Sequence, residues 1–254
     1  MSSVSVKWYG INALEFRHSG GSFMIDPYVS RNREKLYIPE EVDKYITSKP
    51  DFILMTHAHW DHLPDLPHIL RSSDTVLYAS KTACNIMRAL GVPEKNLYPL
   101  TYGETLLLPG KVRVTALESR HMGTCDEAPG YSEIPDINDL KTTGNWRCGE
   151  TFAFMIEVDG KRILNCGSAN LYEPTMSNLE CDYLFCGISR YKPGFPELLT
   201  RNLRYRYLIP THHDEFTLPL DQFYLRDDLQ RLAAEIPGLE SLEIPVLQWT
   251  ALPE

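Results

Sequence analysis

The stretch T-H-A-H-W-D-H at positions 56–62 holds three histidines and one aspartate. It follows a short apolar run, F-I-L-M, which is long enough for a buried strand and too short for a helix. In an extended segment, His57, His59 and Asp61 project to one side, whereas His62 points elsewhere. The spacing therefore favours two metal positions over one.

Imidazole nitrogens with a carboxylate oxygen suit a borderline divalent cation, zinc first and iron or manganese next. The alternative is a group of histidines that only form hydrogen bonds within a loop. Desolvating so many polar groups together is costly without a compensating charge, which favours the metal site. We therefore expect one or two Zn²⁺ ions, with Mn²⁺ or Fe²⁺ as the alternatives.

The composition is that of an ordinary globular protein, with 254 residues of which 43% are hydrophobic and 23% charged. No repeat and no break rich in Pro, Gly and Ser divides the chain, so we expect residues 1–254 to form a single domain. The net charge of −9 works against nonspecific binding to nucleic acid or anionic membrane. Neither a membrane span nor a signal peptide is predicted, and the oligomeric state is left open.

The cysteines are scattered, and none forms a C-x-x-C pair. Several of them sit in apolar, strand-like runs, which favours buried thiols in a reducing compartment. We therefore expect a cytoplasmic protein without a thiolate zinc site. The six are Cys84, Cys125, Cys148, Cys166, Cys181 and Cys186.

Apolar runs and alternation predict strands in two batches. These strands are expected at 4–16, 22–25, 52–55, 75–79, 104–108, 111–118, 151–158, 162–166, 182–188, 205–209 and 242–252. Helical spacing predicts helices at 39–46, at 80–91 with Ser80 as the cap, and at 220–236. The segment 122–150 is rich in Gly, Pro, Asp and Asn and shows no periodicity, so we expect it to be an active-site loop.

The pattern H-x-H-x-D-H after a buried strand resembles the metallo-β-lactamase superfamily of metal-dependent hydrolases. Within it, Trp8-Tyr9-Gly10, Asp26-Pro27 and the P-x-H sequence at 210–212 look most like the L-ascorbate-6-phosphate lactonase-like branch. That branch is also similar to the phospholipases that act on N-acylethanolamine lipids. The resemblance runs from about Val4 to the C-terminus and implies an α/β fold, a four-layer αββα sandwich with its metal site at one edge.

The resemblance assigns metal binding to two sets of side chains: His57, His59 and His121, and then Asp61, His62 and His212. The first set leaves a position for water, whose pKa falls to about 7 on zinc. If only the first ion is bound, Asp61 is expected to orient that water or accept its proton. The implied role of Asp26 is to hold the metal-site loop rather than to bind metal.

The chain departs from the family pattern where an aspartate in a Gly-Asp pair normally bridges the two ions. Here the pair reads Gly167-Ser168, and a neutral hydroxyl leaves the two cations with less compensation. We therefore expect a second ion that is weaker, of another element, or absent. Asp214 is the candidate replacement, although supporting a histidine is the commoner role for such a carboxylate. His213 is expected to be a neighbour rather than a ligand.

The expected reaction is hydrolysis of a small ester, lactone or phosphoester by a metal-bound hydroxide. We expect substrate contacts from Tyr28, Tyr131 and Arg147. The segment 190–206 carries five basic residues against Glu197, which either attract an anionic substrate or form a solvated face. The alternative functions are a mononuclear-iron oxidoreductase of the same fold and a metal-binding protein with little catalysis.

Overall fold

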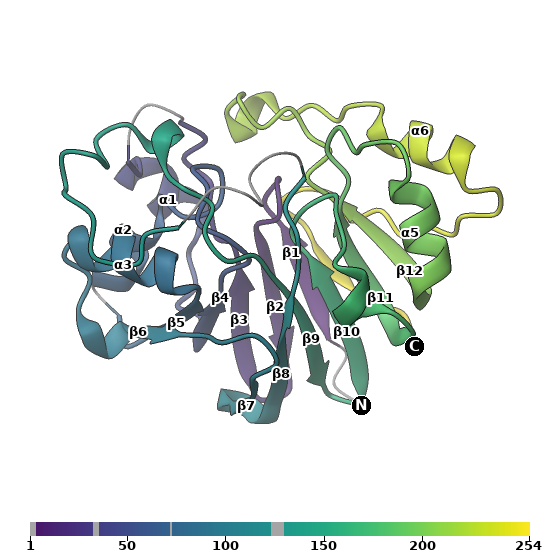
Figure 1. Cartoon of the computed structure of the whole chain (residues 1–254), viewed down its shortest axis with the longest axis horizontal. Coiled ribbons are helices and arrows are strands. Elements are labelled where there is room, and N and C mark those ends of the chain that lie inside the picture. Colours follow the sequence, from purple (N-terminus) through teal and green to yellow (C-terminus); the bar gives the residue numbers. More distant parts are fainter. Residues whose placement is uncertain (1–3, 33–35, 72, 123–129) are drawn as a thin grey trace.

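Two β-sheets pack face to face, and helices cover their outer faces (Figure 1). The computed structural model describes residues 4–32, 36–71, 73–122 and 130–254. The strand order is β13-β1-β2-β3-β4-β5-β6 in the first sheet and β12-β11-β10-β9-β8-β7 in the second. The predicted αββα sandwich is therefore confirmed.

The first sheet and its helices come from the N-terminal part of the chain, with one strand added from the C-terminus. Its strands are β1 (Ser5–Trp8), β2 (Leu14–His18), β3 (Gly21–Ile25), β4 (Phe52–Leu54), β5 (Val76–Ala79), β6 (Leu97–Pro99) and β13 (Trp249–Ala251). Its helices are α1 (Pro39–Tyr45), α2 (Leu66–Arg71) and α3 (Lys81–Ala89).

The second sheet is built from the remaining strands, two of which are nine residues long. They are β7 (Thr105–Leu108), β8 (Val112–Glu118), β9 (Phe152–Val158), β10 (Lys161–Cys166), β11 (Leu179–Gly187) and β12 (Leu203–Thr211). Its helices are α4 (Glu173–Met176), α5 (Phe195–Asn202) and α6 (Asp228–Glu235). None of the helices in the described ranges is long and apolar enough to cross a bilayer.

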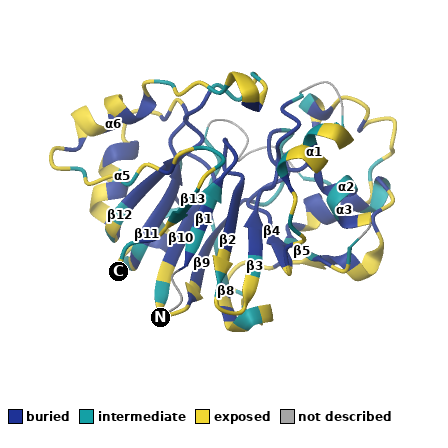
Figure 2. Cartoon of the chain, turned by 180° about the vertical axis from the view of Figure 1, so that it is seen from behind, coloured by how far each residue is buried: buried dark blue, intermediate teal, exposed yellow. Residues whose placement is uncertain are grey.

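The central strands are buried on both faces (Figure 2). Phe23 and Ile25 of β3 point into the core between the sheets, whereas Met24 points into a second core under α1 to α3. A third core lies under α5 and α6, where Leu184 of β11 packs against Leu232. Burial of each such side chain contributes about 1.5–3 kcal/mol, so both faces of each sheet hold the fold together.

Two local predictions are confirmed in detail. Ser80 caps α3, because its Oγ accepts the N–H of Ala83 at 3.0 Å. Asp159 and Gly160 connect β9 to β10 with φ of 47° and 77°. Positive φ at both positions is the geometry of the type I′ hairpin turn that the Asp-Gly pair favours.

The predicted helix at 220–236 is wrong in its first half. The α-helix begins only at Asp228, because the residues before it pair with the segment after β12. The N–H of Glu215 donates to the Tyr224 carbonyl and that of Arg226 to the His213 carbonyl, both at 2.8 Å. These bonds hold 224–226 in an extended conformation that a helix would not allow.

Two predicted strands are shorter than expected. The run 4–16 is interrupted by a turn in which Gly10 and Ile11 have φ of 86° and 51°. The tail 242–252 contributes only β13, which pairs with β1. The helices α2, α4 and α5 were not predicted, since runs of four to eight residues show too little periodicity.

The strand directions gather several loops at one edge of the sandwich. In the first sheet β3 and β4 are parallel, and in the second β10, β11 and β12 are parallel. Strands that run the same way end at the same edge. The loops that follow them therefore meet, and they carry the predicted site residues.

Candidate metal centre

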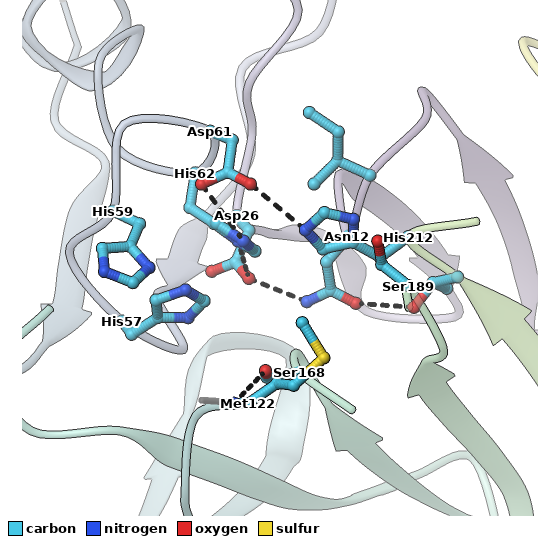
Figure 3. Close-up of polar contacts among 12 residues, drawn as sticks. Asn12, Asp26, His57, His59, Asp61, His62, Met122, Ser168, Ser189 and His212 are labelled. Carbon is cyan, nitrogen blue, oxygen red and sulfur yellow. Dashed lines mark hydrogen bonds and ion pairs between the residues drawn. The ribbon is translucent and has the colours of Figure 1, made fainter. Parts of the chain in front are cut away.

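The six side chains to which the resemblance assigns metal binding lie together at this edge. Figure 3 labels His57, His59, Asp61, His62 and His212 among them. Four of them, His57, His59, Asp61 and His62, come from the loop between β4 and α2. His121 follows β8 and His212 follows β12, so both sheets contribute.

The first cluster consists of His57, His59 and His121. The ring of His57 has its centroid 4.8 Å from those of His59 and His121. Nδ1 of His59 and Nε2 of His121 are 3.2 Å apart. Two nitrogens on one tetrahedral zinc, with bonds of about 2.0–2.1 Å, lie about 3.3–3.4 Å apart. The spacing of these two nitrogens therefore fits one shared ion.

His57 is oriented toward the same point. Its Nδ1 contacts Oγ1 of Thr56 at 3.0 Å, and its Nε2 is buried with no hydrogen-bond partner among the described residues. A buried imidazole nitrogen without a partner is costly unless an ion binds it. The residues present thus fit a metal ion at this position.

The second cluster consists of Asp61, His62 and His212, whose donor atoms all lie within 4.8 Å of one another. Oδ2 of Asp61 is 3.2 Å from Nε2 of His212, and Oδ1 is 3.9 Å from Nε2 of His62. Nε2 of His62 also has no hydrogen-bond partner among the described residues. Two imidazoles and a carboxylate again form a donor set for a divalent ion.

Asp26 at the end of β3 fixes both the loop and one ligand ring. Its Oδ1 accepts the backbone N–H of Thr56 at 2.7 Å, and its Oδ2 accepts the amide N–H of Asn12 at 2.7 Å. Oδ2 also lies 2.8 Å from Nδ1 of His62 and so turns Nε2 of that ring toward the cluster. Partners of this kind set ligand orientation, and the role of Asp26 in holding the metal-site loop stays a prediction.

The histidines of the first cluster are neutral at physiological pH. Burial lowers the pKa of His59 to about 4, where the nearby Asp61 only partly opposes it. Burial and the neighbouring His59 lower the pKa of His121 to about 3, and burial holds the pKa of His57 well below its usual value. Neutral imidazole is the form that binds metal.

The second cluster carries charge instead. Burial disfavours a charged His62, but Asp26 and Asp61 outweigh it and raise the pKa of that imidazole. Burial also disfavours an ionised Asp61, but His62 and His212 outweigh it and lower the pKa of that carboxyl. Asp61 is therefore a carboxylate at neutral pH.

Ser168 lies in the pocket wall and belongs to neither donor cluster. Its Oγ accepts the backbone N–H of Met122 at 3.0 Å (Figure 3). The preceding Gly167 packs so closely on the side chain of Thr56 that a Cβ would collide with it. That Ser168 supports the site without binding metal stays a prediction.

The position of Asp214 argues against the replacement of a bridging carboxylate. Its Oδ1 accepts the N–H of Ile11 at 2.9 Å, and its Oδ2 pairs with Nη2 of the buried Arg31 at 2.5 Å. Asp214 is thus a tether for the loop that carries His212. His213 is a neighbour, since its ring stacks on Trp8 with a centroid distance of 5.4 Å.

A pocket of about 550 Å³ opens over the two clusters. Of the predicted substrate-binding residues, Arg147 lines it. Tyr131 supports Arg147, whose guanidinium lies 4.9 Å from the tyrosine ring. Tyr28 is a correction: its side chain is fully buried, its hydroxyl bonds with Asn32, and it is not among the described residues of the pocket wall.

The predicted active-site loop 122–150 contributes its end to this pocket, where residues 144–148 form part of the wall. Residues 123–129 of the loop lie outside the described residues. Sequence reasoning missed Cys148 in this wall. Sγ of Cys148 and nitrogens of His57 and His59 lie within 4.8 Å of one another. The available signal was the position of Cys148 in the loop, rather than in an apolar run.

Comparison with known proteins agrees with this geometry. Residues 22–212 match the family described as "Beta-lactamase superfamily domain". The chain belongs to the β-lactamase superfamily. The predicted resemblance to this superfamily is therefore confirmed, while the likeness to the lactonase-like branch stays a prediction.

Relatives in the superfamily cover nearly the whole chain. A UPF0173 metal-dependent hydrolase of Pyrobaculum arsenaticum is 23% identical over 246 residues, which are 96% of this chain and 97% of that protein. Igni18, a metallo hydrolase from Ignicoccus hospitalis, has a TM-score of 0.66 at 16% identity and covers 99% of both chains. CmlA, a diiron β-hydroxylase from Streptomyces venezuelae, has a TM-score of 0.58 at 15% identity, over 99% of this chain and 55% of that one. The last two likenesses concern the fold.

Proposed function

We propose that this chain, a metal-dependent hydrolase of the metallo-β-lactamase superfamily, uses zinc-bound hydroxide to cleave a small ester, lactone or phosphoester. The observation that carries the proposal is the opening of one pocket over both donor clusters. A zinc ion bound there supplies hydroxide at neutral pH and stabilises the oxyanion that develops.

Asp61 is the residue best placed to move a proton. It lies in the pocket wall, and His62 and His212 keep its pKa low, so its carboxylate is available as an acceptor. His212, with Nε2 at 3.2 Å, fixes the direction of that carboxylate. When only the first ion is bound, Asp61 would orient the attacking water and receive its proton.

The pocket wall supports an anionic substrate. Arg147 and Arg190 both line it, and Asp61 is the one carboxylate among its described lining residues. Guanidinium groups bind carboxylates and phosphates through paired hydrogen bonds. Trp60, Trp146 and Phe216 add apolar surface for the rest of a small molecule.

The buried cysteines support a cytoplasmic location. Among the described residues, the free thiols in the interior are those of Cys84, Cys148, Cys166, Cys181 and Cys186. Thiols persist in reducing compartments, whereas disulfides are typical of secreted proteins. The location belongs to the proposal and is tested by fractionation of the cells that produce the protein.

The test of the function is turnover by protein of known metal content. We expect zinc-loaded protein to hydrolyse members of a panel of anionic esters, lactones and phosphoesters. His57→Ala should lose at least a hundredfold in turnover, since even residues that only orient a ligand contribute about 10–100-fold. His68→Ala is the matched control, because His68 pairs with Asp43 at the surface. Equal turnover in the two variants contradicts the proposal.

A second candidate is an iron-dependent oxidoreductase. The donor set of Asp61, His62 and His212 favours it, because two histidines and one carboxylate are typical of non-haem iron oxygenases. Metal analysis with an oxygen electrode separates the two functions. Bound iron with oxygen consumption supports this candidate, and zinc with hydrolysis supports the first.

A further inference from the structure

We propose that Cys148 is a metal ligand and that its thiolate joins the histidines of the first cluster. Its Sγ and nitrogens of His57 and His59 lie within 4.8 Å of one another. Bonds of about 2.3 Å to sulfur and 2.0–2.1 Å to nitrogen bring such atoms around one zinc ion after small side-chain movements. Cys148 is 1% exposed and faces the same pocket as His59.

The backbone holds Cys148 against the histidine loop. The N–H of Ala58 donates to the Cys148 carbonyl at 3.1 Å, and Ala58 lies between the two histidines. A few residues on, the N–H of Phe152 donates to the Thr56 carbonyl at 2.8 Å. Two backbone hydrogen bonds, one at Cys148 itself and one at Phe152, thus fix this segment against the histidine loop, and the match is not a chance approach of a loose side chain.

The segment is also held from behind. Gly149 has φ of 66° and packs on Thr82 at the start of α3, where a Cβ would collide with the threonine side chain. The carboxylate of Glu150 accepts the N–H of Thr82 at 3.3 Å. Only glycine combines this φ with so close an approach. The chain therefore presents Cys148 to the pocket from a fixed base.

An independent observation indicates that an ion belongs between these groups. Nε2 of His57 is fully buried and has no hydrogen-bond partner among the described residues. Oγ1 of Thr151 lies 3.5 Å from Sγ of Cys148. When Cys148 loses its proton to solvent on binding metal, the Thr151 hydroxyl can donate to the thiolate.

The thiolate of Cys148 would supply negative charge to the first cluster. Imidazole binds metal in its neutral form, and the hydroxyl of Ser168 is neutral as well. A divalent ion bound by imidazoles alone would keep its full charge in a buried site. The thiolate of Cys148 offsets part of that charge and selects a soft ion, zinc, over manganese.

Cys148 also changes where water binds. With it, the first ion would have Cys148 as a donor beside His57, His59 and His121. The Cys148 thiol groups with His57 and His59 within 4.8 Å, and His121 reaches His59 at 3.2 Å. The second cluster offers three donors and so keeps a position for water. This inference rests on metal binding in the proposed function and is independent of the substrate. The open position would lie in the second cluster, where Asp61 would bind the ion rather than accept a proton.

The experiment is spectroscopy on the full chain in reducing buffer, with cobalt or zinc as the probe. Cobalt-loaded wild type should show a sulfur-to-cobalt charge-transfer band in the near ultraviolet. Zinc X-ray absorption should show one sulfur at about 2.3 Å. Cys148→Ser should lose both signals and bind zinc at least tenfold more weakly, as expected when even an orienting partner contributes about 10–100-fold.

Cys84→Ser is the control, since Cys84 is a buried thiol of α3 outside both clusters. It should retain both signals. Wild type without the sulfur signal, or Cys148→Ser with it, overturns the proposal. The wild-type X-ray absorption decides the matter even if Cys148→Ser does not fold. Failure of the panel of substrates leaves the sulfur signal unaffected, so the two proposals fail separately.

Discussion

The two sheets supply their metal donors in different ways. The first sheet offers four of them from the single loop between β4 and α2. The second offers three from two connections: His121 and Cys148 near the two ends of the segment between β8 and β9, and His212 after β12. Donors in one loop are set by local geometry, whereas donors in separate loops depend on how the sheets pack.

The ties that hold these loops differ accordingly. The loop of the first sheet has its side-chain tie within that half of the fold, since Asp26, just after β3, binds Thr56 and His62. The loop that carries His212 is fixed from across the sandwich. The backbone N–H of His212 donates to the Ile11 carbonyl at 2.7 Å, and Asp214 pairs with Arg31. Substitutions in these two sets of ties should therefore separate metal affinity from stability.

The largest expected effect is on stability, in Arg31→Met. Removing one partner of a buried ion pair costs about 3–5 kcal/mol, because Asp214 would remain charged and unpaired. Urea unfolding of the apoprotein measures the change. Arg88→Met is the control, since the Arg88–Glu94 pair is more exposed and such surface pairs contribute about 0–1 kcal/mol. Equal losses in the two variants would contradict the tether across the sheets.

The next effect is a pH dependence of folding stability, which arises from Asp65 in the half of the fold that contains the first sheet. Asp65 is fully buried, and its Oδ2 accepts the N–H groups of Val29 and Ser30 at 2.6 and 3.0 Å. Burial raises the pKa of this carboxyl to about 6. Its contribution to stability is therefore full below about pH 4 and is lost as the pH rises through about 6.

Asp65→Asn removes this titration. Relative to wild type, the variant should gain thermal stability between pH 4 and pH 7.5 by about 2 kcal/mol, because most of the shift of about two pKa units falls within this window. Scanning calorimetry of both proteins at the two pH values measures it. A difference in Tm that does not change with pH would show that Asp65 does not titrate in this range.

A smaller effect, on metal affinity, should follow when Asp26 is replaced. Asp26→Asn loses the charge that orients His62, and metal affinity should fall by about 10–100-fold. Competition with a chelator measures the affinity. Asp43→Asn is a matched control, because Asp43 contacts His68 at 2.8 Å on the surface. Unchanged affinity in Asp26→Asn would mean that the loop alone sets the geometry.

The smallest expected effect comes from giving the second sheet a carboxylate. Ser168→Asp places an anion in the pocket wall and should tighten binding of the second ion about tenfold, or about 1.4 kcal/mol. Ser168→Asn is the control, because asparagine has about the same size as aspartate but carries no charge. Titration of the apoprotein with zinc compares them. Identical binding curves would show that charge at position 168 does not limit the second site.

The same contrast explains what the sequence could predict. The metal-binding character of the loop 56–62 could be predicted because its donors are close in sequence and the strand before it is apolar. The placing of His121, His212 and Asp26 came from the family resemblance. The fit of Cys148 to His57 was not predictable, since it depends on hydrogen bonds between loops far apart in the chain.

Long-range pairing also explains the errors in secondary structure. The apolar spacing of 220–236 is helical, but its first half bonds to residues after β12 instead. Asp214 was a candidate ligand by spacing alone, and its true partner, Arg31, lies in the other half of the chain. Local patterns carry no information about such partners.

The contact of Gly167 with Thr56 has a consequence for how the pocket can diversify. The two sheets touch here through a backbone with no side chain, directly beside Asp26 and the ring it orients. A methyl group added at Gly167 would collide with Thr56, push the two sheets apart at this point and displace both donor clusters together. New substrate preferences are therefore expected to arise from the rim of the pocket, at positions such as Arg147 and Arg190, while its floor stays fixed.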